Sequence, residues 1–168
     1  STGHTKRFID KLPINMLYAG LIHLALPNAK IINMTRHPMA ACYAVYKQLF
    51  KDAYPFSYDL QDLAKYYIAY HRLIQHWKTV IPGVMYDLKY EDIVHNQEAQ
   101  SQALLTFCDL PWQDQCLRFH ENNTASTTAS AAQVRLPVYD TSIDRWREYS
   151  QQLQPLQIML EQAGISCD

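Results

Sequence analysis

The sequence predicts an α/β fold, a parallel sheet flanked by helices, and three observations lead to this prediction. Two short apolar runs, residues 30–35 (KIINMT) and 84–90 (VMYDLKY), have the composition of buried parallel strands. Apolar residues around them recur at the spacing of amphipathic helices. The alternation of helical segments with such runs is typical of parallel strands joined by crossover helices. The chain has 168 residues, and 48% of them are hydrophobic. Residues 1–168 are therefore interpreted as a single domain.

The helices are predicted from prolines, apolar spacing and breakers. Proline suits the first turn of a helix, so helices are expected from Pro13 and from Pro38. Each further boundary rests on a breaker or a capping residue, such as Pro82-Gly83 after the longest helix and Gly164 after the last one. The predicted helices cover residues 13–26, 38–50 and 59–80, a segment that leads up to 107, and residues 111–119, 142–149 and 153–163.

Two strong strands are fewer than a freestanding parallel sheet normally contains. A short run at residues 7–10 is a candidate third strand. The fold is therefore predicted to be incomplete at its N-terminus, so that the chain is part of something larger.

Composition excludes several classes of function. The formal net charge of -1 argues against a strongly basic nucleic-acid binder. The sequence contains no run of 18 apolar residues, so no membrane span is predicted. Residues 1–10 contain no signal-peptide core, and a cytoplasmic location is therefore expected. The four glycines stand alone, which excludes a glycine-rich phosphate loop within this sequence.

Cysteine and histidine spacing gives no sign of a metal site. No pair among Cys42, Cys108, Cys116 and Cys167 has Cys-x-x-Cys spacing, and no His-x-x-x-His pair occurs. Cys42 and Cys108 lie in apolar runs and are interpreted as small buried hydrophobic residues. Free thiols in a reducing compartment are expected.

Three residues that are distant in sequence are predicted to converge beyond the carboxyl ends of the strands, where α/β sheets bind ligands. Lys11 follows the candidate strand at residues 7–10, Arg36 follows the first strong strand, and Tyr90 ends the second. Two cations and a phenol would suit an anionic ligand that carries a ring. Pattern alone favours the plainer alternative, that both cations are solvated ends of elements.

The polar loop at residues 124–137 and the segment after it add a second group of candidates. Small hydroxyls together with arginines near a helix start are what a phosphate or sulfate needs. The alternative is a surface loop, with Trp146 simply packing on the core. The candidates in this group are Ser126, Ser130, Arg135, Thr141 and Arg145.

An ordered set of segments carries a family resemblance. The chain resembles the carboxy-terminal two-thirds of a sulfotransferase that uses 3′-phosphoadenosine 5′-phosphosulfate (PAPS). The likeness is greatest to tyrosylprotein sulfotransferases and to bacterial sulfotransferase domains fused to tetratricopeptide repeats. The matching segments are residues 8–38 (FIDKLPINMLYAGLIHLALPNAKIINMTRHP), 88–94 (LKYEDIV), 107–112 (FCDLPW) and 124–146 (TASTTASAAQVRLPVYDTSIDRW).

The resemblance implies a role for each matching residue. Lys11 matches a catalytic lysine that neutralises charge on the sulfuryl group, and Ser130 matches a serine that stabilises the transition state. Arg36 opens the 3′-phosphate motif, and Tyr90 matches a tyrosine near the adenine. The resemblance further implies a cofactor-lining loop over residues 130–139, which includes Arg135 and Tyr139, and a phosphate contact from Arg145.

Two positions depart from the family pattern. Ala44 stands where the 3′-phosphate motif has a serine, and Gln48 stands where a second arginine is expected, with Tyr43 or Lys47 as partial substitutes. The family's 5′-phosphosulfate loop and the glutamate base of the tyrosylprotein branch have no match in these residues. The chain alone is therefore expected to bind PAPS weakly and to turn over little.

The implied function is the transfer of a sulfuryl group from PAPS, without a metal, to a hydroxyl of a small molecule, a carbohydrate or a protein by in-line displacement. The resemblance also implies a P-loop-NTPase-like fold and an association with an upstream segment such as tetratricopeptide repeats. The alternative is a catalytically inactive binding or scaffold module. A kinase-like P-loop enzyme ranks last, because no acidic magnesium ligand follows residues 30–35. Neither the acceptor nor the general base is assigned by the sequence.

Overall fold

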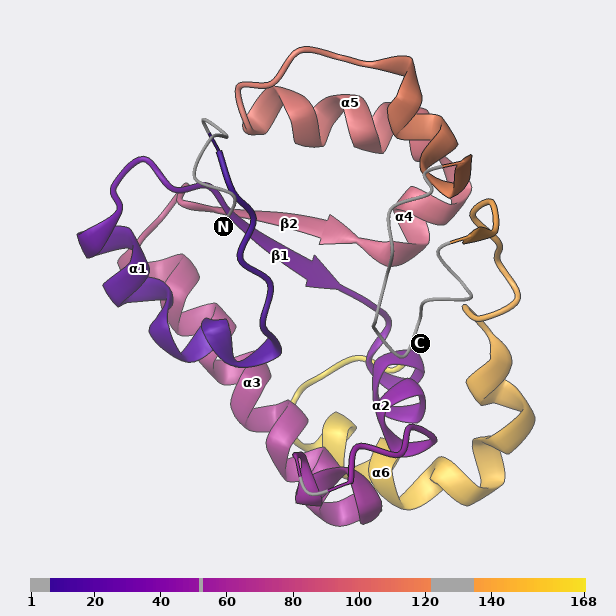
Figure 1. Ribbon diagram of the computed structural model, residues 1–168. Coiled ribbons are helices and arrows are strands. Elements are labelled where there is room, and N and C mark those ends of the chain that lie inside the picture. Colours follow the sequence, from indigo (N-terminus) through magenta and orange to yellow (C-terminus); the bar gives the residue numbers. More distant parts are fainter. Residues whose placement is uncertain (1–6, 52, 122–134) are drawn as a thin grey trace.

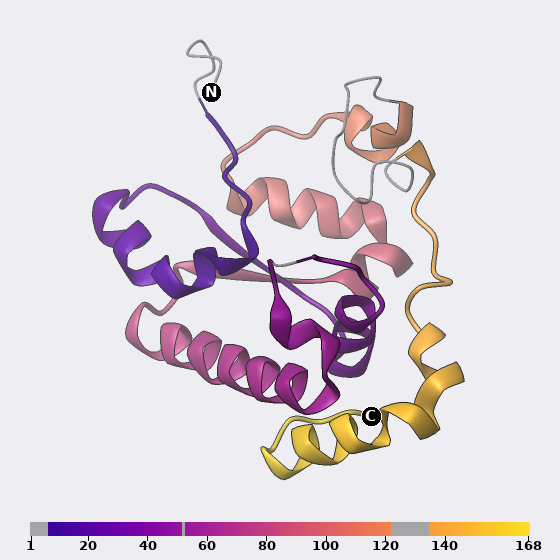
Figure 2. The same cartoon turned by 60° about the horizontal axis from the view of Figure 1, so that its bottom comes forward.

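The computed structural model describes residues 7–51, 53–121 and 135–168, and it has the α/β architecture that the sequence predicts. Strands β1 (Ile31–Thr35) and β2 (Met85–Lys89) lie side by side and parallel, in a register that pairs Ile31 with Met85 and Thr35 with Lys89. Figures 1 and 2 place helices on both sides of the strands, with α5 (Gln97–Phe107) opposite α3 (Leu60–Val80). The parallel sheet flanked by helices is thereby confirmed.

The crossover from β1 to β2 runs through two helices whose starts follow local rules. Helix α2 (Pro38–Tyr46) begins with its proline in the first turn. In α3, the carboxylate of Asp59 caps the helix by accepting hydrogen bonds from the backbone N–H groups of Gln61 and Asp62. The remaining elements are η1 (Pro13–Tyr18), α1 (Ala19–Ala25), η2 (Pro55–Tyr58), α4 (Tyr90–His95), η3 (Asp114–Glu121), η5 (Arg145–Tyr149) and α6 (Ser150–Gln162).

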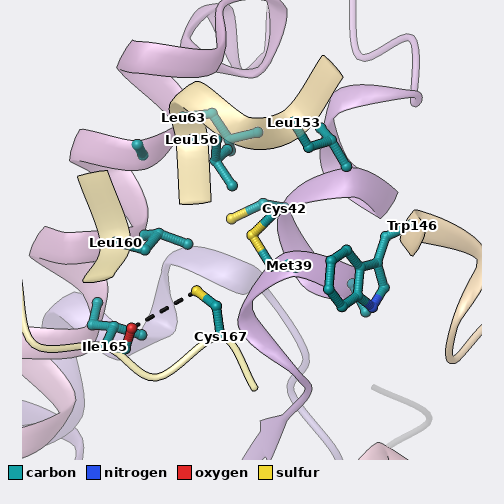
Figure 3. Close-up of a cluster of buried hydrophobic side chains, with 11 residues drawn as sticks. Met39, Cys42, Leu63, Trp146, Leu153, Leu156, Leu160, Ile165 and Cys167 are labelled. Atoms are coloured by element: carbon teal, nitrogen blue, oxygen red, sulfur yellow. Dashed lines mark hydrogen bonds between the residues drawn. The ribbon is translucent and has the colours of Figure 1, made fainter. Parts of the chain in front are cut away.

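The main core lies where α2, α3 and α6 meet, below one end of the sheet (Figures 2 and 3). Leu156 and Leu160 of α6 are fully buried there, against Leu63 of α3 and Met39 of α2. Trp146 extends this core toward the strand ends. The buried cluster comprises Met39, Ala40, Cys42, Leu63, Ala64, Trp146, Leu153, Leu156, Leu160, Ile165 and Cys167.

A polar cluster joins the sheet to α3. Asn33 is buried in the middle of β1, and its side-chain N–H group donates to the Asp87 carboxylate on the paired position of β2 at 2.8 Å. The Tyr70 hydroxyl donates to the amide oxygen of Asn33 at 3.1 Å, and Lys78 pairs with Asp87. These partners satisfy a polar side chain that would otherwise destabilise the fold by its burial.

Several sequence predictions about local structure are wrong. The helices expected over residues 111–119 and 142–149 are the 3-10 helices η3 and η5, and the helix expected over residues 38–50 ends at Tyr46. Residues 7–10 form no strand. The helix expected over residues 13–26 begins as the 3-10 helix η1, and only α1 is α-helical. The helical segment expected to lead up to residue 107 consists of two helices, α4 and α5, and α4 begins directly after β2. The long helix, both strands and the positive φ of Gly164 after α6 agree with prediction.

The apolar face of the first helical segment is exposed rather than buried. Within the described residues, no strand pairs with the edge of β1 that faces away from β2. Phe8 is 73% exposed, Ile9 is 95% exposed and Leu24 is 78% exposed. Many exposed large apolar side chains in residues 8–34 are unusual for a monomer surface. Other side chains of this kind are Leu12, Leu17, Tyr18, Leu21, Leu26, Ile32 and Met34.

Neither a membrane helix nor a metal cluster is found in the described part of the chain. No helix there is both long and apolar enough to cross a membrane. No group of three or more His, Cys, Asp or Glu side chains is placed to hold a metal ion within residues 7–51, 53–121 and 135–168.

The buried thiol of Cys42 is expected to make stability sensitive to alkaline pH. Burial raises the pKa of Cys42 from 9.0 to about 12, and the nearby Cys167 acts in the same direction. Above pH 9 the unfolded chain loses this proton while the folded chain keeps it. The free energy of unfolding should therefore be unaffected by this group below pH 9 and fall above it, by at most about 1.4 kcal/mol per pH unit.

Urea unfolding at pH 7, 9 and 10 measures this decline. The Cys42→Ala variant should start less stable but lose less stability between pH 9 and 10. An equal decline in both proteins would contradict the prediction.

Candidate functional site

The structure brings Arg36 and Tyr90 together at the carboxyl ends of the strands, as the sequence predicts. Thr35 and Lys89 are the last paired residues of β1 and β2, so the next residue of each chain segment emerges at the same edge. The Arg36 guanidinium lies over the Tyr90 ring, 4.9 Å from its centroid. A cation held over an aromatic face is attracted by the ring's negative quadrupole. The pair therefore presents positive charge beside an aromatic surface.

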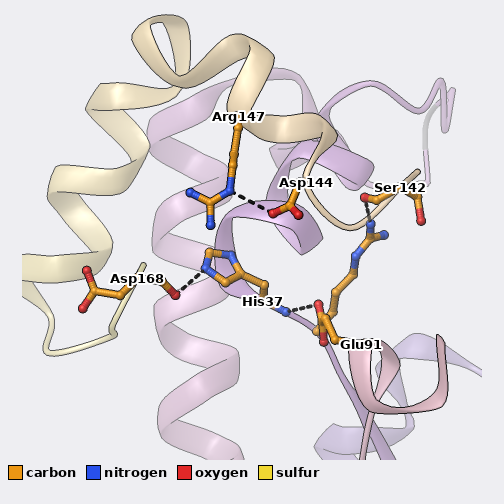
Figure 4. A network of polar contacts seen from close by, with 7 residues as sticks. His37, Glu91, Ser142, Asp144, Arg147 and Asp168 are labelled. Atoms are coloured by element: carbon orange, nitrogen blue, oxygen red, sulfur yellow. Dashed lines mark hydrogen bonds and ion pairs between the residues drawn. The ribbon is translucent and has the colours of Figure 1, made fainter. Parts of the chain in front are cut away.

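Ser142 completes this cluster from a distant part of the chain. An Nη2 N–H of Arg36 donates to the main-chain carbonyl of Ser142 (Figure 4). The Ser142 hydroxyl shares a hydrogen bond of 2.9 Å with the Tyr90 hydroxyl. Strand β1, helix α4 and the turn before η5 are thus joined through three residues.

His37 forms a second set of contacts at the same edge. Its backbone N–H donates to the Glu91 carboxylate at 2.8 Å, and its Nε2 lies 3.0 Å from the main-chain oxygen of Asp168 (Figure 4). Because that oxygen only accepts, Nε2 carries the proton. The imidazole stacks on Trp146, with ring centroids 5.0 Å apart. One oxygen of the Glu91 carboxylate is therefore engaged with the backbone.

Three consecutive residues after the body of β1 have buried polar atoms without a partner among the described residues. They are Thr35 Oγ1, Arg36 Nε and His37 Nδ1. An unpaired buried donor costs roughly 1–3 kcal/mol. Thr35 Oγ1 and Arg36 Nε can both donate to a bound anion, whereas His37 Nδ1 is an acceptor because the ring proton is on Nε2. The two unpaired donors, next to each other at the strand ends, suit an oxyanion.

The start of α2 adds to the positive potential here. The side chain of the N-cap residue, His37, makes no capping hydrogen bond, and the Glu91 carboxylate accepts from the His37 backbone N–H. The free N–H groups of a helix N-terminus and its dipole favour an anion. The departures at Ala44 and Gln48 lie further along this segment, where both residues are half-buried.

The proposed substitutes for these two positions are engaged with each other. Lys47 lies over the Tyr43 ring, 5.2 Å from its centroid, and Tyr43 stacks on Tyr149. Burial raises the pKa of Tyr43, although the charge of Arg145 acts against this shift. Tyr43 is therefore a neutral packing group, and Lys47 is its cationic partner.

The other predicted site residues are not gathered into this cluster by any described hydrogen bond or ion pair. Lys11 is exposed after the irregular segment at residues 7–10. Arg145 is exposed at the start of η5, and Tyr139 is half-buried shortly before it. Arg135 is exposed at the first described residue after the gap. Ser126 and Ser130 lie outside the described residues.

Sequence reasoning did not single out Ser142, His37 or Glu91. His37 and Glu91 directly follow Arg36 and Tyr90 in the sequence, so their place at the same edge of the sheet could have been predicted. Ser142 lies within a segment of family likeness, but only the fold brings its hydroxyl to Tyr90. Trp146 packs on the core, as the alternative interpretation of this segment proposed, and its side chain is 4% exposed.

Comparison with known proteins identifies the family. Residues 1–114 match the model of the sulfotransferase family. An uncharacterized protein of Aquifex aeolicus (strain VF5) is 34% identical over 159 residues, which cover 93% of this chain and 21% of that protein. Protein-tyrosine sulfotransferase A of Caenorhabditis elegans is 25% identical over 150 residues, which cover 83% of this chain and 38% of that protein.

The fold and the match over more than half of the chain define a sulfotransferase domain, and the chain belongs to the sulfotransferase family. It spans about a fifth of the length of the Aquifex aeolicus relative and less than two fifths of the Caenorhabditis elegans relative.

Proposed function

We propose that this chain binds the 3′-phosphate and adenine side of PAPS and that the protein transfers a sulfuryl group from PAPS to a hydroxyl acceptor. The observation that carries the proposal is the unpaired, buried Nε of Arg36 next to the unpaired hydroxyl of Thr35. Arg36 stands at the position that the family resemblance assigns to the 3′-phosphate. A phosphate there would accept both hydrogens in a site with low access to water.

The residues at the strand ends fit this ligand chemically. Arg36 supplies a planar cation, and the start of α2 favours a ligand of negative charge as well. Tyr90 offers an aromatic face at the same edge. The Oε1 oxygen of Glu91 accepts from the His37 backbone N–H, which partly offsets its negative charge at this edge.

When bound, PAPS supplies an activated sulfuryl group, and the chain supplies positive charge and positioning. We propose that Lys11 neutralises negative charge on the sulfuryl side and that Ser130 donates to it. Arg135, Tyr139 and Arg145 are proposed to line the donor. Sulfuryl transfer resembles phosphoryl transfer in that charge stabilisation and alignment contribute most of the rate.

We also propose that a strand-loop-helix segment outside these 168 residues holds the 5′-phosphosulfate. The free edge of β1 and the exposed side chains of Phe8, Ile9, Ile32 and Met34 support this, because a further strand and helix would pair the edge and cover the apolar face.

Calorimetric titration with adenosine 3′,5′-bisphosphate and with adenosine 5′-monophosphate tests the proposal. The bisphosphate should bind at least about tenfold more tightly, since one charge-assisted contact contributes roughly 1.5–3 kcal/mol. A version extended upstream by its neighbouring coding sequence should bind both ligands more tightly than the 168 residues do. Equal affinities for the two nucleotides, or no binding by either version, would contradict the assigned site.

An inactive binding or scaffold module is the second candidate, and the substitutions at Ala44 and Gln48 favour it. Both candidates allow nucleotide binding, so turnover separates them. If the extended protein binds the bisphosphate but transfers no sulfuryl group to phenolic or carbohydrate acceptors, the module is the better description. In that case Lys11→Ala should leave the biological role intact.

A further inference from the structure

Ser142 contacts both members of the Arg36–Tyr90 pair, through different atoms. Its carbonyl oxygen accepts from Arg36 Nη2, and its hydroxyl bonds to the Tyr90 hydroxyl at 2.9 Å. Since Arg36 also lies over the Tyr90 ring, the three residues form a closed set in which each touches the other two. A guanidinium on a flexible stem is held here in one orientation from two sides.

The turn that carries Ser142 is itself fixed. The Ile143 N–H donates to the Asp140 carbonyl at 2.8 Å, and the Arg147 N–H donates to the Asp144 carbonyl at 2.8 Å. Four residues after Ser142, the Trp146 side chain is buried in the core and stacks on His37. Ser142 is therefore supported by packed structure and is not carried on a freely moving loop.

The unpaired Nε of Arg36 gives this arrangement a consequence for binding. With Nη2 engaged by Ser142, the orientation of the guanidinium determines whether Nε faces an incoming anion. An arginine that is already oriented loses less side-chain entropy on binding than a free one.

We propose that Ser142 is a positioning residue, which orients Arg36 and Tyr90 for the 3′-phosphate. This inference rests on the proposed function. Ser142 acts through Arg36 and Tyr90 and needs no contact with the ligand. Loss of the hydroxyl releases Tyr90 from the fixed turn, so the ring beside the Arg36 guanidinium can move and the guanidinium is held from one side instead of two.

Nucleotide affinity in the extended protein tests this proposal. Ser142→Ala should weaken adenosine 3′,5′-bisphosphate binding by about threefold to tenfold, the range of one ordinary hydrogen bond. Tyr90→Phe should cost a similar factor, and the double variant should cost little more, because both single changes remove the same bond. Affinity for adenosine 5′-monophosphate should change less than twofold. Ser142→Thr keeps the hydroxyl and should restore affinity.

Thr79→Ala is the matched control, because Thr79 is an exposed hydroxyl residue whose side chain donates to the Gln75 carbonyl within α3. It should leave both affinities unchanged. Equal weakening of both nucleotides by Ser142→Ala, or a lower melting temperature with unchanged affinity, would reduce Ser142 to a purely structural role and overturn the proposal.

A measurement without nucleotide separates this proposal from the proposed function. In ¹⁵N NMR spectra, the side-chain signal of Arg36 is assigned by its loss in Arg36→Lys. Restricted rotation should give separate Nη signals in the wild type and averaged signals in Ser142→Ala. Identical spectra in the two proteins would overturn the positioning role. Restricted rotation in a protein that binds no bisphosphate would instead refute only the proposed function.

Discussion

Replacing Arg36 with alanine should weaken binding of adenosine 3′,5′-bisphosphate by about 100-fold. The substitution removes the only guanidinium that the described residues place over Tyr90, together with its unpaired Nε. One or two charge-assisted hydrogen bonds to a phosphate contribute roughly 3 kcal/mol together, which corresponds to a factor of about 100. Titration calorimetry on the extended protein measures the loss directly.

Two further variants make this result specific. Arg147→Ala removes an exposed arginine that pairs with Asp144 at 2.8 Å, and it should change affinity less than twofold. Arg36→Lys keeps the charge but loses the planar donor geometry, so its affinity should be intermediate. Affinity for adenosine 5′-monophosphate should persist in Arg36→Ala. A loss below threefold, or an equal loss for both nucleotides, would place the 3′-phosphate elsewhere.

The convergence of Arg36 and Tyr90 was predictable because it follows from local pattern and one topological rule. Each apolar run predicts a strand by its own composition. The two crossover helices between the runs favour a parallel arrangement of the strands. Parallel strands end at the same edge, so the residue after each is placed without knowledge of any side-chain contact. Asp59 and Gly164 likewise signal helix ends through short-range chemistry.

The contacts of Ser142 were not predictable in the same way. It lies 106 residues after Arg36 and 52 after Tyr90, and no periodicity connects these positions. The turn between Tyr139 and η5 carries no regular pattern from which a direction for the hydroxyl follows. The packing of Trp146, which fixes the start of η5, and the hydrogen bonds of the turn determine where this turn lies, and both depend on the complete fold.

The errors in the first 26 residues have a common physical cause. Their apolar spacing predicts a buried helical face, but Leu21 and Leu24 are exposed on α1. A helix in a protein is stabilised mainly by packing of its apolar face. Without that packing, the first part of the segment adopts a 3-10 conformation, and residues 7–10 have no strand partner among the described residues. The sequence pattern predicts the structure that suits a segment. That structure forms only when another segment is present to pack against it or pair with it.

Trp146 connects the core to the strand ends. It is the residue whose loss we expect to destabilise the fold most. One face of the indole is next to His37 at the strand ends, and the Arg147 guanidinium lies 4.7 Å from its centroid. The same side chain belongs to the core shared by α2, α3 and α6. The position of the turn that carries Ser142 therefore depends on the packing of this side chain.

Trp146→Ala should lower the free energy of unfolding by about 3–5 kcal/mol, as for other buried tryptophans, which is a large share of the total for a domain. Trp112→Ala is the matched control, because Trp112 is half-buried and its indole N–H donates to Asp114 two residues away at 2.8 Å. It should cost less than about 1.5 kcal/mol. Urea unfolding followed by far-ultraviolet circular dichroism compares them without relying on tryptophan signals. Equal losses would mean that Trp146 is not the anchor that connects the core to the strand ends.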